Sequence, residues 1–306
     1  MPEKDQAWQV KSSLLSLQEN LQNQLVEIDP SIHSKIDQWK RDEGGGGKTI
    51  AFANGQIIEK GGVNFSDVYG IDLPKTATQN RPELAGASFR AMGVSVVFHP
   101  DNPHIPTTHA NVRYFEAQKE NQPTVWWFGG GFDLTPYYPI LEDVIDWHSQ
   151  AKLACDSLAT GLYDKFKNWC DDYFFLPHRN ETRGVGGIFF DDQNSGGFRQ
   201  NLSFIETVGS TFQSAYFSIL EKRKNSPYTN QQKEFQLYRR GRYAEFNLVY
   251  DRGTHFGLQS RGRTESILMS MPPQVSWQYG WEPEKDSKEE DLYKNYLSPK
   301  DWLNLK

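Results

Sequence analysis

The stretch that decides the fold runs from residue 86 to residue 128 and reads GASFRAMGVSVVFHPDNPHIPTTHANVRYFEAQKENQPTVWWF. Three segments of it, residues 86–98, 111–116 and 124–128, are rich in the Val, Phe, Tyr and Trp residues that favour strands. Polar and proline-rich sequence separates these segments, as expected of loops between strands. The stretch therefore predicts a block of sheet, to which residues 49–52 add a further strand.

Helices are predicted on both sides of this block. Apolar residues recur every three or four positions over residues 5–28, and similar spacing predicts helices over residues 143–169 and 204–220. Residues 36–41 also look helical. The remaining expectations are strands at residues 187–190, 243–250 and 266–271, and loops at residues 42–49 and 283–299.

This order of elements, a helix, a sheet block, helices and more sheet, favours an α+β fold over alternating βαβ units. The chain contains no Pro- or Ser-rich linker that would divide it. We therefore expect residues 1–306 to form a single domain.

The composition excludes several classes of protein. The chain carries 33 Lys and Arg against 39 Asp and Glu, a net charge of −6, which argues against a general nucleic-acid-binding protein. Its two cysteines, Cys155 and Cys170, cannot hold an iron–sulfur cluster within one chain and do not suggest a disulfide scaffold. We find neither an apolar run of the ~18 residues that a membrane helix needs nor the apolar core of a signal peptide. We therefore expect a cytoplasmic protein without a membrane span.

Glycine-rich segments resemble nucleotide-binding motifs without matching them. A phosphate loop needs Gly, four residues, and then Gly-Lys-Ser/Thr. In the run that ends at Gly47, Lys48 and Thr49, the position of the first glycine is Asp42, whose carboxylate would repel phosphate. The glycines at residues 129–131 and 184–187 do not follow the dinucleotide pattern either. The sequence therefore does not support a nucleotide, nicotinamide or flavin cofactor.

Histidines gather in the loop that follows the first strand of the central stretch. His99, His104 and His109 lie in a segment with three prolines, which restrict its backbone. His148 and His178 flank the first long helical stretch, and none of the five has the spacing of an HExxH or Cys-x-x-Cys zinc site. Two interpretations stay open: ordinary surface or core histidines, or an acid–base or metal cluster that the fold assembles.

Arginines form a second group. Guanidinium groups bind carboxylates and phosphates through paired hydrogen bonds, so their number on an acidic protein favours a polycarboxylate or phosphate ligand. The alternative is solvated surface charge, and Asp251 is either an ion-pair partner or a polar anchor in a cleft. Clustered aromatic residues are core, or line a pocket for a large planar ligand. The arginines are Arg113, Arg239, Arg240, Arg242, Arg252, Arg261 and Arg263.

Long strings of residues in fixed order resemble the oxygen-dependent coproporphyrinogen III oxidase family. The resemblance covers most of the chain, from the glycine run at Gly44 to about Trp281, and leaves the first ~40 residues and the charged tail without a match. The strings are GGVNFS at residues 61–66, HPDNPHIPTTHANVR at 99–113, WFGGGFDLTPY at 127–137, RGVGGIFFDD at 183–192, RGRY at 240–243, EFNL at 245–248, YDRGT at 250–254 and GRTESILMSMPP at 262–273.

The resemblance implies a fold, a reaction and an assembly. It implies a large antiparallel sheet between helices and a homodimer, with dimerisation through about residues 243–278. It implies the oxidative decarboxylation of two propionates of coproporphyrinogen III to vinyl groups, which gives protoporphyrinogen IX with O2 as the electron acceptor. No flavin, haem or iron–sulfur centre is expected, and a divalent metal cation is the one added ion that the resemblance suggests.

The resemblance also assigns roles to single residues. His109 matches the proposed proton donor, and Asp251 and Arg252 match a pair in the active-site cleft. The matched metal ligands are His99, His109, His148 and His178. The matched substrate contacts are Ser95, Asn111, Val112, Arg113, Arg261, Gly262 and Arg263. At position 261 this chain has Arg where the family pattern has Gly, and His255 has no assigned role.

A porphyrinogen is rich in electrons and reacts with oxygen, so we expect the protein to supply orientation and charge in place of a redox cofactor. Our hypothesis is that Arg113, Arg252 and Arg263 hold propionates while Asp251 contacts the pyrrole N–H groups. His109 would carry a proton. The competing hypotheses are a metal-dependent oxygenase that uses the histidines on another polycarboxylate, and a tetrapyrrole-binding protein without catalysis.

Overall fold

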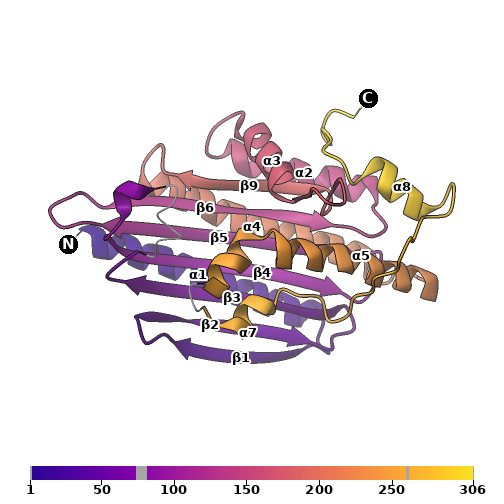
Figure 1. Ribbon diagram of the computed structural model, residues 1–306, viewed down its shortest axis with the longest axis horizontal. Coiled ribbons are helices and arrows are strands. Elements are labelled where there is room, and N and C mark those ends of the chain that lie inside the picture. The colour runs from indigo at the N-terminus through magenta and orange to yellow at the C-terminus, as the bar shows by residue number, and fades with distance from the viewer. Residues whose placement is uncertain (1, 74–80, 260–261, 306) are drawn as a thin grey trace.

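One large antiparallel sheet dominates the structure. The computed structural model describes residues 2–73, 81–259 and 262–305. Within this part of the chain the sheet has seven strands in the order β1-β2-β3-β4-β5-β6-β9 (Figure 1). These strands are β1 (His33–Lys40), β2 (Gly45–Ala53), β3 (Ile58–Gly70), β4 (Ser88–Pro100), β5 (Thr107–Gln118), β6 (Val125–Thr135) and β9 (Gly186–Gln193). A small ribbon pairs β7 (Phe175–Leu176) with β8 (Glu181–Thr182).

Helices cover both faces of this sheet. α1 lies behind it against β3 and β4, and α4 lies behind it against β5 and β6, whereas α5 and α7 cross in front (Figure 1). We call the side of α1 and α4 the back face and the side of α5 to α7 the front face. The helices are α1 (Pro2–Ile28), α2 (Leu141–Asp156), α3 (Leu162–Tyr173), α4 (Phe198–Arg223), α5 (Asn230–Val249), α6 (Arg252–Gln259), α7 (Thr264–Leu268) and α8 (Lys288–Asn295), with a 3-10 turn at Pro82–Leu84.

The two faces receive alternate side chains of each strand. On β5, Ala110, Val112 and Tyr114 are buried on the back face, whereas Asn111 and Arg113 are half-buried on the front. Burying a large apolar side chain contributes about 1.5–3 kcal/mol, so the back face supplies most of the stability of this layer. The front face of the same strand is free to carry polar groups.

The structure confirms the predicted α+β fold with an antiparallel sheet between helices. The predicted helices over residues 5–28 and 204–220 lie within α1 and α4. The stretch over residues 143–169 forms two helices, α2 and α3, separated by a turn at which Gly161 has a positive φ of 85°. The strands of the central stretch are all present: β4 is as long as predicted but begins two residues later, and β5 and β6 are several residues longer than predicted.

The strand predicted at residues 243–250 is wrong, because residues 243–249 form the last turns of α5. Aromatic and branched residues suggested a strand, but Tyr243, Phe246 and Asn247 are buried at helical spacing. The helix begins much earlier, at the Thr229 capping box, in which the side chain of Thr229 accepts a hydrogen bond from the backbone of Gln232 and the Gln232 side chain bonds back.

Four shorter predictions also differ from the structure. Residues 36–41 fall mostly in β1, the exposed edge strand, and not in a helix. The glycines at residues 45–47 belong to β2, where pairing with β3 orders a segment that looks flexible in isolation. Residues 266–268 end α7 instead of forming a strand, and the expected loop at residues 283–299 contains α8, which Ser287 caps through the backbone of Glu290.

Candidate active site

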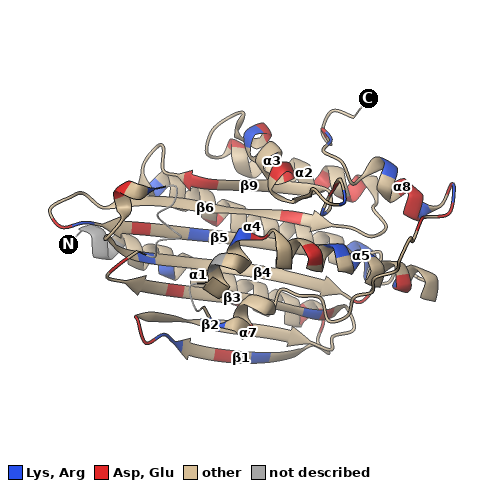
Figure 2. Ribbon diagram, viewed as in Figure 1, with Lys and Arg blue, Asp and Glu red and all other residues tan. Residues whose placement is uncertain are grey.

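Small side chains form the floor of the site on the front face. Ser95 on β4 lies opposite Asn111 on β5, and Asn111 lies opposite Gly131 on β6. Gly131 has φ near 146°, and a Cβ there would come within 2.1 Å of the Ile188 carbonyl oxygen, so no larger residue fits. The middle strands therefore present a shallow surface to the front. In Figure 2 the charged residues of these strands appear as scattered bands on β5 and β6 and at the end of β9.

His109 lies on this face and is oriented by a buried carboxylate. Its Nδ1 is 2.9 Å from Asp133 Oδ1 on the neighbouring strand, and Asp133 is 2% exposed. Burial opposes the charge of Asp133, but Arg183 and His109 together lower its pKa. A charged Asp133 fixes the ring orientation of His109 and leaves Nε2 as the nitrogen that can exchange a proton.

Arg183 balances Asp133 and ties the site to α5. Its guanidinium donates two hydrogen bonds of 2.7 Å to the Asp133 carboxylate and one of 2.8 Å to Asn247 Oδ1. Its central carbon lies 4.0 Å from the ring centroid of Phe174 and 4.6 Å from that of Tyr243. Arg183 is therefore a buried, fully paired cation that holds Asp133, and through it His109, in place.

Asp251 immediately precedes α6, where it caps the start of the helix, and it is the second carboxylate of the site. It accepts hydrogen bonds from Tyr173 Oη at 2.8 Å, from the Thr254 backbone at 2.8 Å and from Thr254 Oγ1 at 2.7 Å. Burial opposes its charge, but these hydrogen bonds and, as a smaller contribution, His109 lower the pKa of Asp251, so it is a carboxylate at neutral pH.

Tyr173 links this end of the site to Arg113. Its ring stacks on Phe189 with centroids 4.3 Å apart, and the exposed Arg252 guanidinium lies 4.9 Å above the Tyr173 ring. Arg113 lies on the other side, 5.6 Å from the Phe189 centroid. Asp251, Arg252 and Arg113 therefore border one continuous aromatic surface.

The remaining predicted substrate contacts lie in different parts of the structure. Arg263 pairs with Asp37 on β1, toward the far edge of the sheet, and α7 is joined to β2 and β3 through Ser266. The Gly262 backbone N–H donates to the Gly257 carbonyl at 2.7 Å. The side chain of Val112 is 4% exposed and points to the back face, so only its backbone can take part. Arg261 lies outside the described residues.

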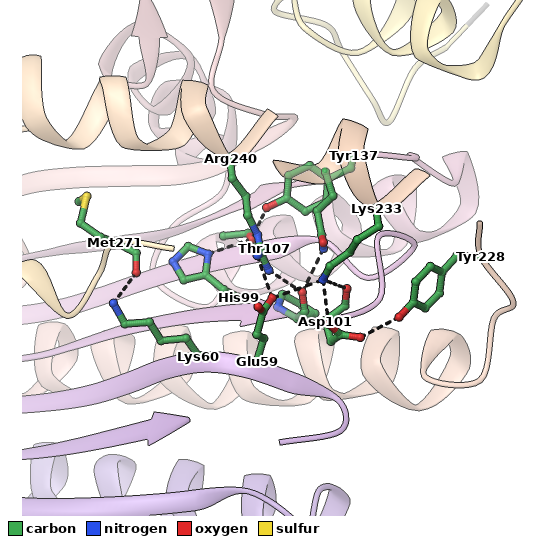
Figure 3. Close-up of polar contacts among 12 residues, drawn as sticks. Glu59, Lys60, His99, Asp101, Thr107, Tyr137, Tyr228, Lys233, Arg240 and Met271 are labelled. Atoms are coloured by element: carbon green, nitrogen blue, oxygen red, sulfur yellow. Dashed lines mark hydrogen bonds and ion pairs between the residues drawn. The ribbon is translucent and has the colours of Figure 1, made fainter. Parts of the chain in front are cut away.

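His99 is buried in a polar network at the ends of β3 and β4 (Figure 3). Its Nε2 is 2.9 Å from the Ser270 carbonyl oxygen and its Nδ1 is 3.2 Å from Thr107 Oγ1. Lys60 donates to the neighbouring Met271 carbonyl at 2.8 Å, so the network fastens the segment after α7 to the sheet. Burial first, and then the charges of Arg240 and Lys60, lower the pKa of His99 well below its usual value, so the ring is neutral.

The other two histidines lie apart from this network. His148 in α2 is buried, with Nδ1 2.9 Å from Tyr163 Oη and Nε2 3.0 Å from the Val185 carbonyl oxygen, and burial lowers its pKa to about 3. His178 is 2.8 Å from Glu245 through Nε2 and 3.1 Å from Tyr250 Oη through Nδ1.

These contacts do not fit a metal site. A neutral imidazole has one N–H and one lone pair, and in His99 and His148 both nitrogens are already engaged. Among the described residues, no group of three or more His, Cys, Asp or Glu side chains is placed to hold a metal ion. The structure therefore does not gather His99, His109, His148 and His178 within this chain, and we derive no chemical step through a metal.

Sequence reasoning missed four residues of the site: Asp133, Arg183, Tyr173 and Asp191. Asp133 faces the front because of strand alternation, and it meets His109 because of the register between β5 and β6. Asp191 lies where the pairing of β6 with β9 shifts register. Asp133, Arg183 and Asp191 lie within the strings WFGGGFDLTPY and RGVGGIFFDD. The strings drew attention to these segments, but the sequence does not tell which of their side chains face the site.

A face that carries arginines and two oriented carboxylates, Asp133 and Asp251, is chemically suited to a ligand with several carboxylates. Residues 9–302 match the family model described as coproporphyrinogen III oxidase, so the chain belongs to the coproporphyrinogen III oxidase family. It is therefore an oxidoreductase of porphyrin biosynthesis. In the described part of the chain, none of the helices is both long and apolar enough to cross a membrane.

Proposed function

We propose that this chain removes two propionate carboxyl groups of coproporphyrinogen III with O2 as the electron acceptor. Each propionate, RCH2CH2COO⁻, with O2 and one H⁺ gives RCH=CH2, CO2 and H2O2. The two electrons that reduce O2 come from the C–H and C–C bonds that break. The observation that carries the proposal is the family match over residues 9–302.

The cysteines support the oxygen-dependent form. The chain has only Cys155 and Cys170, too few thiolates for the three or four that bind an iron–sulfur cluster. Both are buried, and burial raises the pKa of each thiol, so neither is a thiolate at neutral pH. A cluster-based radical route therefore has no ligand set in this chain.

The front face supplies binding and charge. In this proposal Arg113, Arg252 and Arg263 hold propionates around a macrocycle lying on the Ser95–Asn111–Gly131 floor, and the propionate at Arg263 replaces Asp37. The span from β3 to β6 is about 14 Å at the usual strand spacing, which suits a tetrapyrrole. The aromatic pair Tyr173 and Phe189 would contact its apolar edge.

Asp251 and His109 divide the proton chemistry. The carboxylate of Asp251 accepts hydrogen bonds from the pyrrole N–H groups and stabilises positive charge that develops on the macrocycle as O2 reacts. The Nε2 atom of His109 then moves a proton between the reacting group and solvent, while Asp133 holds the ring. The proton leaving the propionate β-carbon is taken by a base close to that carbon.

The experiment is incubation of purified protein with coproporphyrinogen III, with and without O2, following vinyl product, CO2 and H2O2. We expect product only with O2, at one CO2 and one H2O2 for each vinyl group. Tight binding of the tetrapyrrole without CO2 release would support a carrier instead. A second arm uses protein dialysed against chelator: full activity supports the proposal, and loss restored by one metal ion would favour a metal-dependent oxygenase.

We also propose that the protein is a homodimer through residues 243–278. Part of this segment is used inside the chain, since Tyr243 and Phe246 are buried. Other side chains of the segment are exposed, with Trp277 56% exposed and Val249 52% exposed, and they offer apolar surface to a second copy. Light scattering of the purified protein distinguishes a dimer from a monomer.

A further inference from the structure

One ion pair crosses the front face directly over a glycine. Arg113 on β5 is 3.0 Å from Asp191 on β9 through Nη2 and Oδ2, although β6 lies between the two strands. A Cβ on Gly129 of β6 would come within 2.5 Å of Asp191 Oδ1 and 2.7 Å of Arg113 Nε. The absence of a side chain at Gly129 therefore allows the pair to form across the strand.

The backbone of β9 is shaped to aim Asp191 at this position. The pairing of β6 with β9 shifts register between Phe128 and Gly130, and Asp192 has a left-handed φ of 54°. Such an irregularity redirects one side chain of a strand. The next carboxylate, Asp192, turns away to pair with Arg81 at 2.6 Å. Two adjacent aspartates thus serve two different arginines.

The pair is exchangeable. The side chains of Arg113 and Asp191 are 32% and 34% exposed, so water reaches both. Exposed pairs contribute only about 0–1 kcal/mol, and an arriving carboxylate can replace one partner at small cost. Arg113 keeps its orientation without Asp191, because its Nη1 also donates to Asn111 Oδ1 at 2.9 Å.

We propose that Asp191 is a specificity-determining residue that occupies the substrate carboxylate position on Arg113 in the free protein. A propionate displaces it on binding, and Asp191 takes Arg113 back when the ligand leaves. Asp191 therefore weakens ground-state binding and speeds release, which suits an enzyme that must process two propionates of one macrocycle. This inference rests on the proposed function, since it takes Arg113 as a propionate-binding residue.

The test compares Asp191→Asn with Asp192→Asn, which removes the same charge from the neighbouring residue. We expect Asp191→Asn to lower KM about three- to fivefold, with kcat unchanged or lower because release slows. Asp192→Asn should leave KM within about twofold. The Kd for coproporphyrin III, a stable tetrapropionate measured by fluorescence, should fall in parallel in Asp191→Asn. Asp191→Ser, with a check of the melting temperature, serves as a second variant against a folding artefact.

A double-mutant cycle with Arg113→Lys tests whether Asp191 acts through Arg113. In the Arg113→Lys protein, Asp191→Asn should lower KM by less than about twofold. A KM that is unchanged or raised in Asp191→Asn, or an equal effect of Asp192→Asn, would overturn the inference. If the unaltered protein releases no CO2 from coproporphyrinogen III, the proposed function fails first, and coproporphyrin III binding then tests Asp191 separately.

Discussion

The two faces of the sheet are held to their helices by different forces. On the back face, Phe132 packs edge-on against Trp147 of α2 with centroids 4.9 Å apart, and the neighbouring contacts are also apolar. On the front face, the segment around α7 is attached by polar contacts: His99 to the Ser270 carbonyl, Lys60 to the Met271 carbonyl and Asn64 to the Ser266 carbonyl. A smaller apolar cluster around Phe189 and Phe246 joins β9 to α5 on this face.

The difference explains how one sheet serves both stability and chemistry. Apolar contacts need no hydrogen-bonding partners, and they make up most of the contacts on the back face. A site for a charged ligand needs polar groups that stay partly hydrated, which costs stability on the front. Substitutions on the back should therefore change folding without changing catalysis, and substitutions on the front should do the reverse.

The largest effect is expected from Phe132→Ala on the back face. Removing this ring from the contact with Trp147 and Phe212 leaves a cavity and should lower the free energy of unfolding by about 3–5 kcal/mol. The measurement is urea unfolding, with KM determined on the folded fraction. A changed KM at unchanged stability would contradict the division between the faces.

Next in size is Asp251→Asn on the front face. We expect turnover to fall at least about a hundredfold, because the neutral amide cannot stabilise the charge that develops on the macrocycle. The melting temperature should stay nearly unchanged. Tyr173→Phe, which removes one of the hydrogen bonds to Asp251, is the matched control and should cost much less activity. Near-normal turnover in Asp251→Asn would refute its catalytic role.

A sharper comparison uses two neighbours on β5 whose side chains face opposite sides. Val112→Ala should lower stability by about 1.6 kcal/mol, the value for two buried methylene-sized groups, and leave KM unchanged. Arg113→Lys should raise KM about tenfold, because an ammonium lacks the paired donors of a guanidinium, and leave stability nearly unchanged. The measurements are steady-state kinetics and thermal unfolding of both variants. If both variants change KM and stability alike, the two sides of β5 do not separate binding from stability.

The smallest effect concerns pH and the ion cluster that Asp67 forms with Arg90 and Lys11 at the rim of the back face. Burial opposes the charge of Asp67, but Arg90 and Lys11 lower its pKa below 3.8. Its contribution to stability is therefore present above the ordinary value near 3.8 and is lost as the pH falls through the lowered pKa. Asp67→Asn should cost about 1 kcal/mol at pH 7 and less near pH 2. Unfolding free energies at both pH values test this, and an equal loss at both would show that the charge is not responsible.

Much of the fold could be predicted from the sequence because the relevant signals are local. The spacing of Val10, Leu14, Leu21 and Leu25 specifies α1, and branched and aromatic residues specify the central strands. The errors fell where contacts outside the segment decide: β1 forms by pairing with the next strand, β2, and residues 243–249 continue a helix that packs on the sheet.

The candidate site was predictable in part. Asp251, Arg252, His109 and Arg113 were found from the resemblance, and the structure places them around one surface. The four histidines expected as metal ligands do not lie together in this chain. His148, for example, is buried in α2 and bonds to Tyr163 and to the Val185 carbonyl, contacts that sequence spacing does not reveal.

The sequence by itself determined the α+β class, the central strands, the family and the lack of a cluster-binding cysteine set, because residue types, local periodicity and long strings are properties of the chain. Only the tertiary structure decided which side chain meets which. The register of β5 against β6 pairs His109 with Asp133, and the glycine at 129 lets Asp191 reach Arg113 across a strand. Such contacts depend on strand alternation and on backbone position in space, which a linear pattern does not encode.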